Sequence, residues 1–163
     1  MIPPRLQTAS LFLSYAMAGI FWGAFAASTP AIQVRSGLEA GGFGLALGAM
    51  TLTAFPVMQV FGRVISRITP FAIPLAMAVF ALGCLTLAAA PSLPVLLVAL
   101  GILGGASGAL DIALNMRTAR IEEDTGARLF NRVHAVFPLA MLVASGNTAW
   151  TRLKSREIGR AHV

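Results

Sequence analysis

Between Arg67 and Asp111 the chain runs for 43 residues without a single charged side chain. The turn Pro91-Ser92-Leu93-Pro94 divides this stretch into two apolar segments. A helix needs about 20 apolar residues to cross the hydrocarbon core of a bilayer, which is about 30 Å thick. Each segment is long enough, so the stretch predicts two consecutive membrane-spanning helices. We therefore expect this chain to fold in a lipid bilayer and not in water.

Similar uncharged gaps recur along the chain. Together they predict five transmembrane helices, at about residues 9–27, 42–61, 70–90, 94–116 and 133–150. The composition agrees, since 57% of the residues are hydrophobic and only 11% are charged, far from the mix of an ordinary soluble domain. The fold class expected is an all-α membrane protein, with residues 1–150 forming one helical bundle.

The basic residues carry information about orientation. A net charge of +6 could suggest a nucleic-acid partner, but the charges lie between apolar spans, so no nucleic acid is expected. Alternate sides of the five spans hold seven basic residues and one: Arg5, Arg63, Arg67, Arg117, Arg120, Arg128 and Arg132 against Arg35. The positive-inside rule then predicts a cytoplasmic N-terminus. The location we expect for this multi-pass protein is the bacterial inner membrane.

Several other classes of site are not expected. Cys84 is the one cysteine, so the chain contains no internal disulfide and no cysteine-based metal site. No phosphate-binding loop, zinc-protease motif or nucleophile elbow occurs, which predicts no enzyme activity, metal or cofactor. The small residues of Ala24-Phe25-Ala26 resemble a signal-peptide cleavage site, but four spans follow, which favours an uncleaved first helix.

The C-terminal segment departs from this pattern. After five spans the chain should emerge outside, yet basic residues crowd residues 152–160 against the charge rule. Residues 158–163 match one reading frame of a common sequencing-library adapter, ATC GGA AGA GCA CAC GTC. We therefore expect residues 151–163 to be an artefactual read-through tail on the N-terminal part of a longer protein.

Asp111 is the one ionisable residue well inside a predicted span. An acid at the centre of a membrane helix costs about 2.5 to 3.5 kcal/mol on insertion scales, so something must compensate. At 3.6 residues per turn one face of this helix, about 120° wide, carries Gly101, Gly104, Gly105, Gly108, Asp111 and Asn115. This face predicts either a solute or proton site, with Asn115 beside the acid, or a buried polar contact between helices.

Four other positions have two interpretations each. Tyr15 and Trp22 fit either interhelical packing or an aromatic surface in a solute cavity. His134 fits an interface residue or a proton relay, and Arg63 fits a cytoplasmic charge anchor or a gating contact. Separately, two glycine pairs at four-residue spacing, Gly44 with Gly48 and Gly101 with Gly105, predict close helix packing.

Two segments resemble the major facilitator superfamily. At the turn between the second and third spans that family carries Gly-x-x-x-Asp-Arg-x-Gly-Arg, and Gly62 and Arg67 match while Ser66, Thr69 and Pro70 depart from it. Residues 108–115, followed by Asn131 and His134-Ala135-Val136-Phe137, are similar to the fucose-permease-like branch.

The resemblance implies about five helices of a twelve-helix permease, the incomplete N-terminal half, which would move a small polar, sugar-like solute with protons. Asp111 would contribute to the solute site and proton coupling, and Gly62, Arg63 and Arg67 would form the gating loop. The first helix lacks the acid that fucose permeases carry, with Ser28, Thr29 and Pro30 in that stretch, so fucose itself is not implied. The partners expected are the solute, the bilayer and the missing C-terminal half. Two alternatives stay open, a truncated fragment without activity and a small membrane scaffold.

Overall fold

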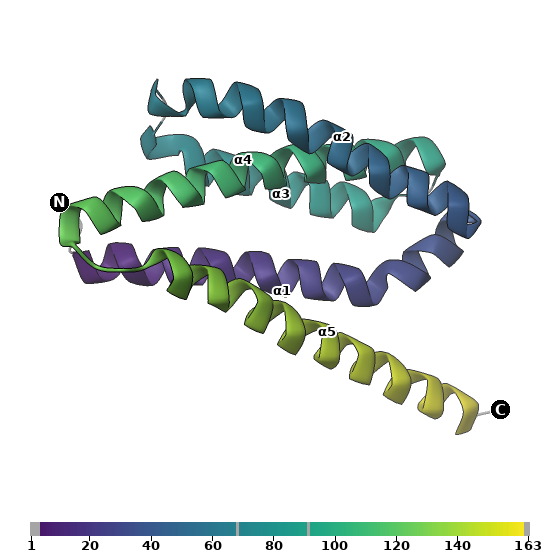
Figure 1. The fold of residues 1–163 in the computed structure, drawn as a ribbon. Helices are drawn as coiled ribbons and strands as arrows, with labels where there is room; N and C mark the ends of the chain where they lie inside the picture. Colours follow the sequence, from purple (N-terminus) through teal and green to yellow (C-terminus); the bar gives the residue numbers. More distant parts are fainter. Residues whose placement is uncertain (1–3, 68, 91, 162–163) are drawn as a thin grey trace. The chain divides into compact units, whose positions relative to one another are not determined.

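The computed structural model describes residues 4–67, 69–90 and 92–161, with the side chains of residues 4, 67, 69, 70 and 156–161 outside the description. Within these ranges the chain forms five α-helices and one 3-10 turn: α1 Pro4–Ser36, α2 Ala40–Val64, η1 Ile65–Arg67, α3 Thr69–Ala89, α4 Leu93–Thr125 and α5 Phe130–Ala161 (Figure 1). The expected all-α fold class is confirmed.

Four of these helices are long and apolar enough to cross a membrane. The qualifying segments are Arg5–Ser36, Ala40–Val64, Phe71–Ala89 and Leu93–Thr125, the third having the highest mean hydropathy, 2.2. The protein is thus a multi-pass membrane protein. Among the described residues α5 does not reach this standard, because His134, Asn147 and the charged residues after 150 dilute its apolar stretch.

The helices extend well beyond the segments predicted from hydropathy. Helix α4 was expected to end at residue 116 but continues to Thr125 through a charged segment. Outside the hydrocarbon core a helix needs no apolar surface, and Arg, Ala and Glu all favour helical backbone. Gly126 then ends the helix with a φ of +68°, and its N–H donates to the Glu122 carbonyl at 2.8 Å.

Proline does not end the first helix. The first span was expected to end at about residue 27, but α1 continues through Pro30 to Ser36 and stops before Gly37, which has a φ of +67°. A proline removes one backbone donor and leaves one carbonyl without its helical partner, a cost that a helix close to its end can bear. Pro56, Pro74 and Pro138 also lie inside helices.

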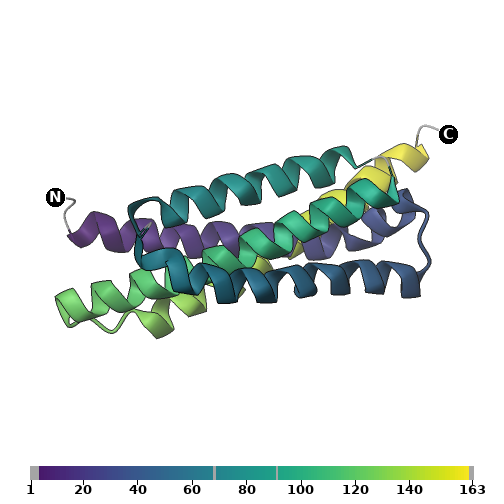
Figure 2. The ribbon, with the colours of Figure 1, turned by 90° about the horizontal axis from the view of Figure 1, so that it is seen from above.

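The helices group into two compact units, residues 1–32 with 117–163 and residues 33–116. In the first unit α1 and α5 run side by side and parallel (Figures 1 and 2). A Cβ at Gly19 would lie 2.3 Å from the Phe137 carbonyl oxygen, and a Cβ at Gly23 would lie 2.2 Å from that of Met141. Since both positions lack a side chain, the two backbones can touch.

In the second unit α4 packs against both α2 and α3 (Figure 2). A Cβ at Gly104 would lie 2.0 Å from the Met50 carbonyl oxygen on α2. On the other side, a Cβ at Gly83 of α3 would lie 2.9 Å from Leu103 of α4. Leu100 and Leu103 are fully buried, so the centre of this unit is a face of α4.

Candidate solute site

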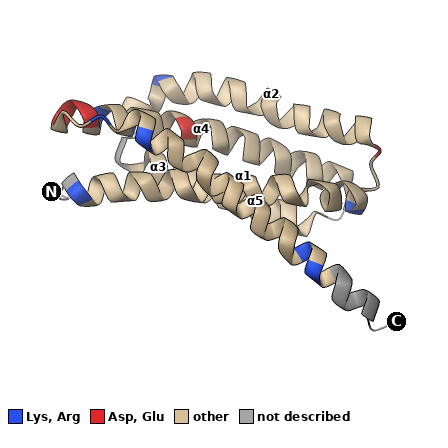
Figure 3. Ribbon diagram, turned by 60° about the horizontal axis from the view of Figure 1, so that its bottom comes forward, with Lys and Arg blue, Asp and Glu red and all other residues tan. Residues whose placement is uncertain are grey.

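The carboxylate of Asp111 is exposed on α4. Most charged residues lie toward the helix ends, and one acidic residue within the length of α4 stands apart from them (Figure 3). Among the residues that the structure describes, no hydrogen bond or ion pair engages this carboxylate. The Asp111 carboxylate therefore has its full capacity to accept hydrogen bonds.

The glycine face next to Asp111 is used for helix contact. Gly104 and Gly108 both meet α2, since a Cβ at Gly108 would lie 2.9 Å from the Ala54 carbonyl oxygen. Gly101 and Gly105 have looser contacts. A Cβ at Gly101 would lie 3.6 Å from the Thr53 Cγ2, and a Cβ at Gly105 would lie 3.2 Å from the Val57 Cγ2. Close approach of α2 and α4 thus depends on the pair Gly104 and Gly108, at small-xxx-small spacing.

Gly44 and Gly48 do not make the close helix contact expected of them. Within the described chain, a Cβ at either position would meet nothing within 4 Å. The physical reason is that α4 crosses α2 further along, at Met50, Ala54 and Met58. Glycine spacing alone does not say which stretch of a helix meets its neighbour.

A threonine that the sequence argument did not select links the same two helices. The Thr53 hydroxyl has carbonyl oxygens at 2.8 Å, on Met50 of its own helix, and at 3.0 Å, on Gly101 of α4. Gly104 leaves the room for this hydroxyl, because a Cβ there would lie 2.6 Å from the Thr53 Oγ1. A polar residue inside an apolar span, one helical turn from a tight contact, is the signal that could have identified it.

In the other unit, Tyr15 and His134 lie together. Tyr15 is buried, 4% exposed, and its ring centroid lies 5.1 Å from that of His134. Phe130 stacks on the same imidazole, with centroids 4.3 Å apart and an interplanar angle of 21°. Two aromatic rings therefore hold the imidazole in place.

One nitrogen of this imidazole is engaged. His134 Nδ1 lies 2.9 Å from the Phe130 carbonyl oxygen. A carbonyl only accepts hydrogen bonds, so this contact requires Nδ1 to carry a hydrogen. In the neutral ring Nε2 is then the atom that can accept a proton. Asn131, one turn earlier than His134, is exposed.

Trp22 belongs to a different group of rings from Tyr15. It packs edge-on against Phe21 and Phe25, with centroid distances of 5.3 and 5.6 Å. This cluster lies on one side of α1, where the indole is half-buried. The predicted aromatic pair thus separates into two clusters, Tyr15 with His134 and Trp22 with two phenylalanines.

The predicted gating turn is described in part. Gly62 is exposed, with nothing within 4 Å of a Cβ placed there. Arg63 is also exposed and donates to the Gln59 carbonyl oxygen at 2.9 Å, a contact within its own helix. Arg67 lies in η1, and its side chain falls outside the described residues.

Glu122 and Arg117 order the end of the first unit at which α1 begins and α4 turns into α5. One carboxylate oxygen of Glu122 accepts hydrogen bonds from the backbone N–H groups of Leu129 and Phe130, the latter at 2.8 Å. These donors stand at the start of α5, where helix N–H groups lack helical partners. Arg117 donates to the Gln7 side-chain oxygen at 2.8 Å.

Arg35, which lies between the first two predicted spans, has a structural role. Its guanidinium donates to the carbonyl oxygens of Leu87 at 2.9 Å and Ala88 at 3.3 Å. Both carbonyls lie in the last turn of α3, where the helix dipole favours a cation. The Leu87 carbonyl also accepts a hydrogen bond from the Ala90 N–H at 3.3 Å. Arg35 therefore caps α3.

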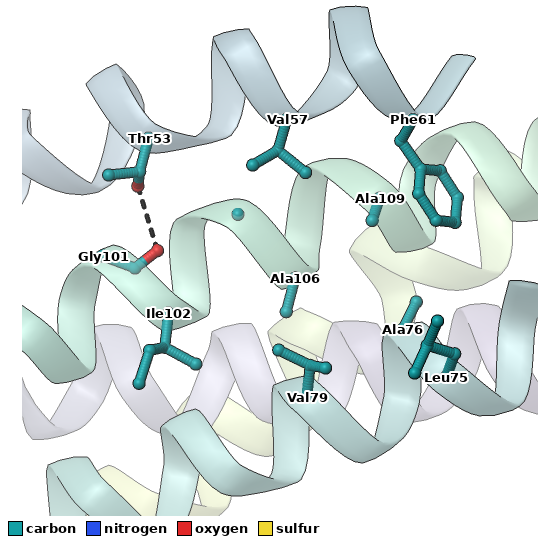
Figure 4. A pocket seen from close by; sticks show the side chains of 11 residues that line it. Thr53, Val57, Phe61, Leu75, Ala76, Val79, Gly101, Ile102, Ala106 and Ala109 are labelled. Atoms are coloured by element: carbon teal, nitrogen blue, oxygen red, sulfur yellow. Dashed lines mark hydrogen bonds between the residues drawn. The ribbon is translucent and has the colours of Figure 1, made fainter. Parts of the chain in front are cut away.

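An apolar groove lies between α2, α3 and α4 (Figure 4). Its volume is about 470 Å³, and apolar atoms make up its accessible lining. Such a groove offers nothing to orient a polar solute. Asp111 does not line it. Among the described residues, no group of three or more His, Cys, Asp and Glu is placed to hold a metal ion.

The chain is similar to two curated proteins. It is 29% identical over 135 residues to an uncharacterized transporter of Sinorhizobium fredii, covering 78% of this chain and 34% of that protein. It is 26% identical over 148 residues to an uncharacterized MFS-type transporter of Yersinia pestis, covering 90% of this chain and 38% of that protein. No family model matches the chain, and no solved structure does either.

The chain spans little more than a third of the length of the curated relatives it matches. Both relatives are named as transporters, and one carries the abbreviation of the major facilitator superfamily. These matches support the assignment of the chain to part of a membrane transporter.

Proposed function

We propose that this chain is the N-terminal part of a major facilitator permease that moves a small polar, sugar-like solute together with protons. In such permeases two helical halves move about a solute site near the middle of the membrane. The observation that carries the proposal is the unpaired carboxylate of Asp111 within a membrane-spanning helix. Because hydrocarbon penalises a charge there, the carboxylate must face water, solute or a partner group.

Asp111 is the proposed proton carrier and solute ligand. A carboxylate accepts hydrogen bonds from sugar hydroxyls when ionised, and it can donate one when protonated. Protonation also neutralises the carboxylate, and a neutral carboxyl group is less costly than a charged one in surroundings of low dielectric constant. Asn115, one turn further along the same helix, would add an amide to the solute site.

His134 is the second proposed proton group. Its Nδ1 contact with the Phe130 carbonyl and its ring contact with Tyr15 fix the orientation of the imidazole. Nε2 would then accept and release the proton. In the unit of α1 and α5, Asn131 and the aromatic surface of Trp22 are further proposed contacts of the solute. Arg63 and Arg67 are proposed to act at the gating turn.

The membrane orientation and the missing partner belong to the same proposal. The chain would lie in the bacterial inner membrane with its N-terminus in the cytoplasm, and the C-terminal half would supply the rest of the solute cavity. The length of the relatives supports this view. Sequencing of the genomic locus past codon 150 tests it, since an uninterrupted frame with six or seven further spans is expected.

Transport by the full-length protein tests the role of Asp111. Proteoliposomes loaded with a pH-sensitive dye are challenged in turn with L-fucose, D-galactose, D-glucose, D-mannose and L-arabinose. At least one sugar should drive proton movement with the wild type. Asp111→Ala should abolish it and Asp111→Glu should keep part of it, with elution profiles confirming that each variant is folded. Unchanged transport by Asp111→Ala would refute the assigned role.

A further inference from the structure

The groove between α2, α3 and α4 has no role in the proposed transport. It is lined along α2 by Thr53, Val57 and Phe61, and along α4 by a run of small residues that includes Gly105 and Ala106. Val79 of α3 points into it from the facing wall (Figure 4). All three helices qualify as membrane spans, so the groove lies within protein segments that hydrocarbon surrounds.

The chemistry of the lining excludes polar occupants. The one side chain with a heteroatom is Thr53, and its hydroxyl is already bonded to carbonyl oxygens. An ordered water needs two or more polar partners, and the groove supplies none. Whatever fills the groove must therefore be apolar.

The size and openness of the groove narrow the choice further. The groove has a volume of about 470 Å³. A transmembrane helix is about 10 Å across along its whole length, so the groove cannot enclose one. Two lining side chains, Leu75 and Val79, are also exposed, at 51% and 38%. The groove thus opens onto the apolar outer surface of α3, where Phe71 and Leu82 are exposed as well. In a bilayer, acyl chains cover that surface.

We infer that the groove between α2, α3 and α4 binds one acyl chain of a membrane phospholipid. Small residues on α4 make the hollow, and the surrounding bilayer supplies the occupant at high local concentration. Arg63 is an exposed cation two residues after Phe61 in α2, and basic residues near a membrane surface attract lipids with anionic headgroups. This inference depends on the membrane location alone and stands apart from the proposed transport.

Native mass spectrometry of the full-length protein with phosphatidylglycerol tests the inference. Val79→Phe places a ring in the groove, while Leu82→Phe adds the same ring to α3 at an exposed position that does not line the groove. We expect Val79→Phe to weaken the tightest phosphatidylglycerol adduct at least tenfold, and Leu82→Phe to leave it unchanged. Equal binding by Val79→Phe and the wild type would overturn the inference.

A second measurement needs no substitution and so does not depend on the folding of a variant. Wild-type protein is reconstituted with phosphatidylglycerol that carries a photoreactive diazirine on one acyl chain, and labelled peptides are mapped. Labels should concentrate on residues 53–61 and 101–109, which line the groove. Labelling of exposed Phe71 and Leu82 alone, or crosslinks from the groove to another part of the protein, would refute the proposed lipid site.

Discussion

Gly104→Ala tests whether α2 and α4 are held together by direct contact of their backbones. The new Cβ would lie 2.0 Å from the Met50 carbonyl oxygen and 2.6 Å from the Thr53 Oγ1. Carbon and carbonyl oxygen approach to about 3.3 Å in the closest favourable contacts, so the helices must separate by roughly 1.3 Å. A backbone carbonyl cannot rotate away as a side chain can.

Two opposing effects set the change in the free energy of unfolding caused by Gly104→Ala. Overpacking of a tight contact costs about 1 to 3 kcal/mol, and separation also lengthens the bond from Thr53 to the Gly101 carbonyl, now 3.0 Å. Alanine gains up to about 1 kcal/mol over glycine in helix propensity. We expect Gly104→Ala to lose about 1 to 2 kcal/mol, whereas Gly48→Ala, which meets nothing within 4 Å, should be neutral or slightly stabilising.

Reversible unfolding in mixed detergent micelles measures the difference. The chain in mild detergent is titrated with SDS, and helix content and size-exclusion profile are followed for the wild type and both variants. The midpoint should fall for Gly104→Ala and not for Gly48→Ala. Identical midpoints for the two alanine variants would refute a backbone contact at Gly104.

Four further predictions concern the contacts that position the helices. Thr53→Val should lose about 0.6 kcal/mol, the average for a hydrogen bond between membrane helices, and Thr53→Ser should retain stability in the same SDS titration. Gly19→Ala and Gly23→Ala should each weaken contact between α1 and α5, seen as a lower SDS midpoint; a double variant no less stable than the wild type would contradict this. Arg35→Ala should speed hydrogen exchange in the last turn of α3, with Arg35→Lys retaining partial protection, and equal rates would exclude a cap. Glu122→Ala should speed exchange at the first amides of α5, while Glu122→Gln, which keeps an acceptor oxygen, should change it less.

The number and order of the helices could be predicted from sequence because uncharged stretches of about 20 residues have one stable arrangement in a bilayer. Their ends could not, since hydropathy marks the hydrocarbon boundary and not the end of helical backbone. Helix α4 therefore continues beyond residue 116, and α1 continues through Pro30.

The candidate site was predictable only in its types of residue. Asp111 stands out because a lone acid in a membrane span is costly. His134 stands out because it lies in a segment that resembles the fucose-permease-like branch. Which residues meet depends on helix rotation and crossing, which no single sequence pattern specifies. The pairing of Tyr15 with His134, and the separation of Trp22 from both, follow from the parallel packing of α1 and α5.

The backbone contacts at Gly19, Gly23, Gly104 and Gly108 have a consequence for how such a protein can change over evolutionary time. A contact made by main-chain atoms constrains only the few positions that must stay empty. Substitutions elsewhere on the same helices leave the spacing between the axes intact. Distant homologues can therefore keep the same helix arrangement while most of their outward-facing residues diverge.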